Sequence, residues 1–152
     1  MKGSFKMEVK IKLLNKNAKL PVYKTDGSAA MDLSYASEIP LTVRPGERVL
    51  VPTGIAISLP SAGYAALVCA RSGLSSKHGI TLSNGIGVID SDYRGEIKVA
   101  VINLGSDDYT IDPGERIAQL MFVPIEHAAI SVTDSLDETE RGTGGFGSTG
   151  KD

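Results

Sequence analysis

Short apolar stretches separated by turns rich in proline and glycine run through most of this 152-residue chain. In residues 7–13, apolar and charged side chains alternate, which is the period of a half-buried β-strand. Pro45-Gly46 and Pro113-Gly114 are typical of the turns between stretches. Short strands at this spacing predict an all-β, antiparallel sandwich or barrel rather than βαβ units. The other expected strands are Arg48–Val51, Ile55–Leu59, Tyr64–Ala70, Gly79–Leu82, Gly87–Asp90, Glu96–Asn103, Arg116–Val123 and Ile130–Thr133.

Only one segment has a helical pattern. We expect Ser72 to cap a short helix over Gly73–His78 and Gly79 to end it. Near the C-terminus the composition changes, and five of the 17 glycines lie between residues 141 and 150. We therefore expect one domain over residues 1–134, followed by a flexible glycine-rich tail over residues 135–152.

Composition excludes several classes of protein. The 16 Lys and Arg residues against 18 Asp and Glu give a net charge of −2, which disfavours a nucleic-acid polymer as partner. A single cysteine cannot form an intrachain disulfide, and a fold without disulfides is usual for intracellular proteins. Lysines interrupt the apolar residues of the N-terminus, so neither a signal peptide nor a membrane span is expected. The expected class is a cytoplasmic, water-soluble domain.

The segment Asn84–Ile97 is expected to form a hairpin, in which one strand ends at Asp90 and the next begins at Glu96. An aspartate fixed at a strand end can orient and deprotonate water, and Tyr93 offers a flat ring to a ligand. Two glycines in the first strand would let a planar ligand approach the backbone. The alternative is a plain hairpin whose Asp and Ser residues only form the turn.

Two further places suit a polar ligand. Arg71-Ser72-Gly73 brings a guanidinium, a hydroxyl and backbone N–H groups to a helix start, which favours an anion, although a simple cap with a surface arginine is equally compatible. Gln119 lies within an apolar strand, where its amide needs hydrogen-bond partners or faces a site.

The glycine-rich tail resembles two phosphate-binding motifs in letters only. Residues 145–152 contain GxGxxG and nearly a P-loop, but neither has the following helix that holds the phosphate. Successive backbone N–H groups and Arg141 could still wrap a polyphosphate, with Phe146 stacked on a base. The alternative is a flexible terminus.

Taken together, these stretches resemble the five motifs of the trimeric deoxyuridine triphosphatases (dUTPases), in order and in spacing, from about Lys10 to Gly150. Each motif is weak alone, but five in order are specific. In the first motif, Ala30-Met31 stands where the family more often has Gly followed by an aromatic residue or Leu. The motifs are Ala29-Ala30-Met31-Asp32-Leu33, Arg71-Ser72-Gly73-Leu74, residues 87–95, Gly114-Glu115-Arg116-Ile117-Ala118-Gln119 and residues 141–150.

The resemblance implies a β jelly-roll that assembles as a homotrimer with active sites at subunit contacts. It implies hydrolysis of dUTP to dUMP and pyrophosphate, which keeps uracil out of DNA and supplies dUMP for thymidylate synthesis. Asp90 would orient the attacking water, Tyr93 would pack on the deoxyribose, and Asp32 would support Mg²⁺ through water, the metal being held mainly by the triphosphate. Implied substrate contacts are Asn84, Gly87, Val88, Ile89 and Lys98 near uracil, Arg71, Ser72, Gly73 and Gln119 at the phosphates, and Arg141, Phe146, Gly147, Ser148 and Thr149 from a neighbouring subunit's tail.

Three alternatives have weaker support. A dCTP deaminase shares the fold, but such enzymes are usually longer and carry an Ala-His-Arg-Ile-Asp-like stretch where this chain has Gly87-Val88-Ile89-Asp90. Their chemistry also needs a glutamate base beside the pyrimidine, and the first strand of the expected hairpin contains no glutamate here. A non-catalytic nucleotide-sensing trimer has no need of a water-activating carboxylate. A plain structural β-module leaves Phe146 and the tail unexplained.

Overall fold

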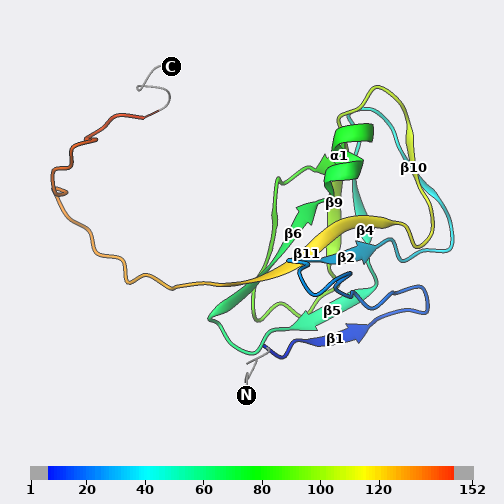
Figure 1. The fold of residues 1–152 in the computed structure, drawn as a ribbon, viewed down its shortest axis with the longest axis horizontal. Helices are drawn as coiled ribbons and strands as arrows, with labels where there is room; N and C mark the ends of the chain where they lie inside the picture. Colours follow the sequence, from blue (N-terminus) through cyan, green and yellow to red (C-terminus); the bar gives the residue numbers. More distant parts are fainter. Residues whose placement is uncertain (1–6, 146–152) are drawn as a thin grey trace.

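The computed structural model describes residues 7–145, which form antiparallel strands and one short helix (Figure 1). The strands pair as β1-β5, β10-β3, β4-β9-β7 and β2-β11-β6-β8. This arrangement confirms the expected all-β, jelly-roll-like barrel. The elements are β1 (Lys10–Leu13), β2 (Met31–Ser34), β3 (Leu41–Val43), β4 (Arg48–Pro52), β5 (Ile55–Ser58), β6 (Tyr64–Ala70), α1 (Ser72–His78), β7 (Ile80–Leu82), β8 (Gly87–Ile89), β9 (Lys98–Asn103), β10 (Tyr109–Ile111) and β11 (Arg116–Pro124).

One apolar core holds these small sheets together. In β9, buried and less buried side chains alternate along the strand, as expected for a strand with one face on the core. Leu33, Ile55, Val99 and Leu120 come from four different strands and are buried in the same cluster. Removal of such side chains from water is the main force that stabilises the fold.

The repeated Pro-Gly-Glu-Arg sequence forms the same turn twice. Gly46 and Gly114 have φ angles of 78° and 77°, a left-handed conformation that glycine adopts without steric cost. In each turn the following glutamate accepts a backbone hydrogen bond of 2.9 Å, Glu47 from Arg44 and Glu115 from Asp112. The turns lead into β4 and β11, as predicted.

The predicted hairpin is wrong. β8 pairs with β6, whereas β9 pairs with β4 and β7 in another sheet. The connecting residues cross between the sheets, and the Ile97 N–H donates to the Ile55 carbonyl at 2.8 Å. For this reason β9 starts at Lys98, two residues later than predicted.

Two smaller predictions also need correction. Ser72 is the first residue of α1 and not its cap; Arg71 occupies the cap position, without a side-chain hydrogen bond. The strand expected over Ile130–Thr133 is absent, because this segment has no partner strand in the described chain. Ile130 and Val132 are instead 87% and 97% exposed.

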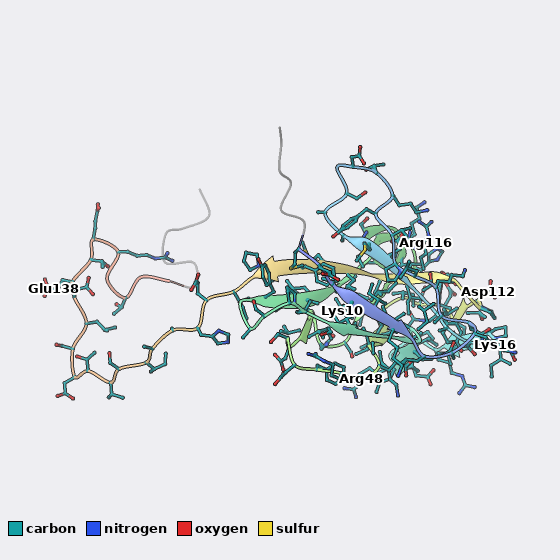
Figure 2. All side chains as sticks on the ribbon, turned by 90° about the horizontal axis from the view of Figure 1, so that it is seen from below. Lys10, Lys16, Arg48, Asp112, Arg116 and Glu138 are labelled. Carbon is teal, nitrogen blue, oxygen red and sulfur yellow. The ribbon has the colours of Figure 1, made fainter. Side chains whose placement is uncertain are left out.

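Beyond β11 the chain leaves the barrel. Residues 126–145 contain no helix or strand, and they extend away from the sheets, with Glu138 far from the core (Figures 1 and 2). No helix in the described range, 7–145, is long and apolar enough to cross a membrane.

Candidate active site

Asp90 directly follows β8 and lines a cavity of about 430 Å³. Tyr93 turns back toward it, with its N–H 3.2 Å from the Asp90 carbonyl oxygen. Within the described residues, no protein group pairs with the Asp90 carboxylate by hydrogen bond or ion pair, and the residue is exposed. This carboxylate is therefore available to water or a ligand. The Asp90 cavity is lined by Leu50, Val88, Ile89, Asp90, Tyr93, Glu96, Ile97 and Lys98.

The ring of Tyr93 is fixed by its neighbours. Its hydroxyl donates to the Glu96 carbonyl oxygen at 3.0 Å, while the residue stays 44% exposed. A Cβ atom at Gly95 would lie 2.3 Å from the Tyr93 hydroxyl oxygen. The absence of a side chain at Gly95 therefore leaves room for the Tyr93 ring in its observed position.

Glu96 is a second carboxylate in the Asp90 cavity and was not predicted as a site residue. One of its oxygens accepts the Gly54 N–H at 2.9 Å, and the other lies 3.9 Å from the Lys98 Nζ. Glu96 and Lys98 are two residues apart, which puts their side chains on one face of an extended chain. This spacing is the sequence signal that could have indicated the pair.

A second hollow, of about 380 Å³, forms around Asp32. Asp32 in β2 lies opposite Gln119 in β11. Its carboxylate accepts a hydrogen bond from the Arg116 guanidinium at 2.8 Å and lies 3.4 Å from the Arg71 Nε. Arg71 also donates to the Arg116 carbonyl oxygen at 2.7 Å. We call this the arginine hollow; it is lined by Lys24, Ser28, Ala29, Ala30, Asp32, Arg71, Arg116 and Gln119.

The two hollows differ in charge. The arginine hollow contains three cationic side chains, Lys24, Arg71 and Arg116, against one carboxylate. The Asp90 cavity contains two carboxylates against Lys98. An excess of guanidinium and ammonium groups suits phosphate oxygens. Of the cations that were not predicted, Arg116 stands in a recognised motif, whereas no pattern in the sequence distinguishes Lys24.

Other predicted residues lie near these hollows without lining them. Ser72 and Gly73 open α1 beside Arg71, and Asn84 is an exposed turn residue before β8. Gly87 lies opposite Val68 in β6, where an added Cβ would meet the valine Cβ at 3.1 Å.

Arg141, the one predicted tail residue within the described range, lines neither hollow. Arg141 is exposed on the extended segment and donates to the Gly144 carbonyl oxygen at 2.9 Å. Phe146, Gly147, Ser148 and Thr149 lie outside the described residues.

Within one chain, the two hollows are separate. They share no lining residue, and β2 and β8 are the opposite edges of one four-stranded sheet. Three inter-strand spacings amount to about 14 Å, so Asp32 and Asp90 do not meet in one cavity of this chain.

The donor groups fit a magnesium ion only in part. No cluster of three or more His, Cys, Asp or Glu side chains with metal-ligand geometry occurs in residues 7–145. Mg²⁺ in such sites takes most of its ligands from substrate phosphates and water, with one or two carboxylates from the protein. Asp32 and Asp90 provide carboxylates in this number, one in each hollow, so the site would suit a metal whose other ligands are water and phosphate oxygens.

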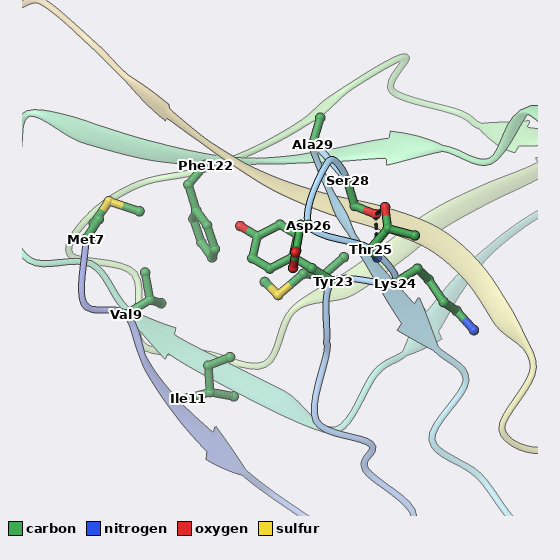
Figure 3. A pocket seen from close by; sticks show the side chains of 11 residues that line it. Met7, Val9, Ile11, Tyr23, Lys24, Thr25, Asp26, Ser28, Ala29 and Phe122 are labelled. Carbon is green, nitrogen blue, oxygen red and sulfur yellow. Dashed lines mark hydrogen bonds between the residues drawn. The ribbon is translucent and has the colours of Figure 1, made fainter. Parts of the chain in front are cut away.

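A third cavity, of about 680 Å³, borders the arginine hollow, with which it shares Lys24, Ser28 and Ala29. Figure 3 shows Met7, Val9, Tyr23 and Phe122 around it. It contains none of the predicted site residues.

Comparison with known proteins identifies the family. The dUTPase family model matches residues 16–150. Deoxyuridine 5'-triphosphate nucleotidohydrolases of Desulfitobacterium hafniense (strain DSM 10664 / DCB-2) and Paraburkholderia phymatum are 53% and 49% identical, covering 97% and 96% of this chain and 98% and 99% of theirs. The solved structure of a mutant Staphylococcus bacteriophage 80alpha dUTPase with dUpNHpp superposes with a TM-score of 0.87 at 29% identity, covering 94% of this chain and 98% of that one. The chain belongs to the dUTPase family.

Proposed function

We propose that this protein hydrolyses dUTP to dUMP and pyrophosphate. The proposal rests on the Asp90 carboxylate, which has no hydrogen-bond or ion-pair partner among residues 7–145 and lies in one cavity with the ring of Tyr93. Relatives about half identical over nearly the whole chain are named as dUTP nucleotidohydrolases. A family member with this site intact is therefore expected to have the same activity.

In the proposed reaction, Asp90 accepts a proton from a water molecule that attacks the α-phosphorus. The bond from this phosphorus to the oxygen that bridges to the β-phosphate breaks, and pyrophosphate leaves. A positioned general base of this kind contributes roughly 10²–10⁴-fold to the rate. Asp32 would support, through water, a Mg²⁺ ion carried by the triphosphate, and this ion would supply positive charge that stabilises the reacting group.

The two hollows divide the substrate between them. Arg71, Ser72, Gly73 and Gln119 bind phosphate oxygens. The nucleoside lies at the Asp90 cavity, where the backbone and side chains of Asn84, Gly87, Val88, Ile89 and Lys98 surround uracil. Tyr93 packs on the deoxyribose and disfavours a ribose 2′-hydroxyl, because its ring occupies the space that this hydroxyl needs.

A homotrimer would join the two hollows. Their separation within one chain supports a site formed between subunits, as does the exposure of Ile130 and Val132, whose apolar side chains are more stable when another chain covers them. In this arrangement the segment 135–152 closes over the substrate of a neighbouring site, with Phe146 on uracil and Arg141, Gly147, Ser148 and Thr149 at the phosphates. We also propose the cytoplasm as its compartment, in keeping with the single cysteine.

Product analysis tests the proposal. The protein is incubated with Mg²⁺ and, separately, with dUTP, dCTP, dTTP and UTP. Release of dUMP and pyrophosphate from dUTP alone is the expected result. Deamination of dCTP would instead identify a deaminase, and binding of dUTP without turnover would identify a nucleotide sensor.

A further inference from the structure

Lys24 stands where two cationic hollows meet. It lines the arginine hollow and also an adjacent groove of about 260 Å³ that Lys19 and Arg116 share. Lys24 and its neighbour Tyr23 also line the 680 Å³ cavity. In Figure 3 the Lys24 ammonium group points away from the Tyr23 and Phe122 rings. Lys24 therefore lines two hollows together with arginines, Arg116 in both and Arg71 in one.

The other cations of this region already have partners. Asp32 holds both Arg71 and Arg116, and the Lys19 Nζ donates to the Gly114 carbonyl oxygen at 2.9 Å. For Lys24, no carboxylate of residues 7–145 comes within the 4.0 Å of an ion pair. Lys24 thus supplies positive charge that the described part of the chain does not neutralise.

We propose that Lys24 binds the terminal phosphate of the substrate, an inference that rests on the proposed function. The terminal phosphate carries the largest negative charge of a nucleoside triphosphate, since its second ionisation occurs near neutral pH. Lys24 is exposed on the rim, while Arg71 and Gln119 flank Asp32 deeper in the hollow. An ammonium group acts as a mobile point charge and needs no fixed geometry, which suits the end of the triphosphate farthest from the reacting phosphorus.

The experiment compares Lys24→Gln, Lys24→Arg and the control Lys12→Gln in the full-length protein. Lys12 is an exposed lysine of β1 that lines none of the hollows described above, so Lys12→Gln makes the same change in net charge without touching the site. Steady-state kinetics with dUTP are combined with product inhibition by pyrophosphate and by dUMP.

Loss of one charge-assisted hydrogen bond changes binding by about tenfold. For Lys24→Gln we expect KM for dUTP and the inhibition constant of pyrophosphate to rise by about this factor. The kcat value and inhibition by dUMP, which lacks the outer phosphates, stay at the wild-type level. Lys24→Arg recovers most of the loss, and Lys12→Gln resembles the wild type.

The inference would be overturned if Lys24→Gln left KM for dUTP and inhibition by pyrophosphate unchanged. It would also be overturned if inhibition by dUMP weakened as much as inhibition by pyrophosphate. Failure of the wild type to release dUMP and pyrophosphate would contradict the proposed function instead. In that case, calorimetric titration with pyrophosphate decides separately: about tenfold weaker binding in Lys24→Gln supports the role of Lys24, and equal binding overturns it.

Discussion

Two carboxylates in the Asp90 cavity, Asp90 and Glu96, differ in their partners. Glu96 accepts the Gly54 N–H and lies near Lys98, so its oxygens hold the turn and the lysine in place. Asp90 has no such partner among residues 7–145 and faces the cavity. The Glu96 oxygens are thus occupied, whereas the Asp90 oxygens have no partner in the described chain, which supports the proposal that Asp90 is the base and that Glu96 is an anchor.

Replacing Asp90 by Asn tests this assignment. The amide keeps the size of the side chain but cannot take a proton from water, so we expect kcat to fall by roughly 10²–10⁴-fold. Because Asp90 is exposed and unpaired in the described chain, thermal stability and dUTP affinity should not change. Single-turnover rates and equilibrium binding measure the two effects separately. Near-normal turnover would remove Asp90 from its role.

Gly95→Ala is expected to act through Tyr93. Its new Cβ cannot lie 2.3 Å from the hydroxyl oxygen, so the ring must move away from the turn. The ratio of kcat/KM for dUTP to that for UTP should then fall toward the value of Tyr93→Ala. Tyr93→Phe, which keeps the ring and loses only the bond to Glu96, serves as the control. A wild-type ratio in Gly95→Ala would mean that ring position does not select the sugar.

At the scale of strands, alternation of side chains predicted most elements but not their partners. β4, β6 and β11 lie within a residue of the prediction, because Pro and Gly turns delimit them and one face is buried. β3 and β10 are only three residues long and pair with each other across distant sequence, so no local period marks them. Ile130–Thr133 has the right period but no partner strand in the described chain. Pairing depends on contacts that a local pattern does not contain.

In the site, too, the sequence predicted what depends on local order and missed contacts between distant residues. The sequence pattern located Asp90 at a strand end and Arg71 at a helix start, since both depend on local order. It did not reveal that Arg116 shares Asp32 with Arg71, because this contact joins residues 84 positions apart. Likewise no local pattern marks Lys24, because the hollows that it lines bring together residues far apart in the sequence.

Tyr109 in β10 gives this part of the fold a pH dependence. Burial raises its pKa well above the usual range, and its hydrogen bond to the Glu115 carboxylate raises it further. The folded chain therefore keeps a proton that the unfolded chain releases above pH of about 10. Stability contributed by the neutral hydroxyl is present below that pH and falls as pH rises beyond it.

We expect Tyr109→Phe to be less stable than the wild type near neutral pH, by about 1 kcal/mol for one hydrogen bond. Its free energy of unfolding should fall less steeply than that of the wild type above pH of about 10. Chemical denaturation across this range, at fixed protein concentration, measures both effects. Equal slopes in the two proteins would show that Tyr109 does not control the alkaline limb.

At the scale of the whole molecule, the division of the site predicts complementation between inactive subunits. Asp90→Asn lacks the base but keeps the arginine hollow, and Arg71→Ala has the opposite defect. If each site takes Asp90 from one subunit and Arg71 from another, mixed trimers contain some sites with both residues intact. For random assembly at equal amounts, about one quarter of the sites are complete, whereas sites formed within one chain would never be restored.

Co-refolding the two variants, followed by assay of dUTP hydrolysis, measures this directly. The matched control mixes Arg71→Ala with Gln119→Ala. Arg71 and Gln119 line the same hollow of one chain, so every site in a mixed trimer has one of these two residues replaced. Activity should therefore stay at the level of the separate variants. Activity in the first mixture and not in the second would establish a shared site. Equal, residual activity in both would confine each site to a single chain, despite the separation of Asp32 and Asp90.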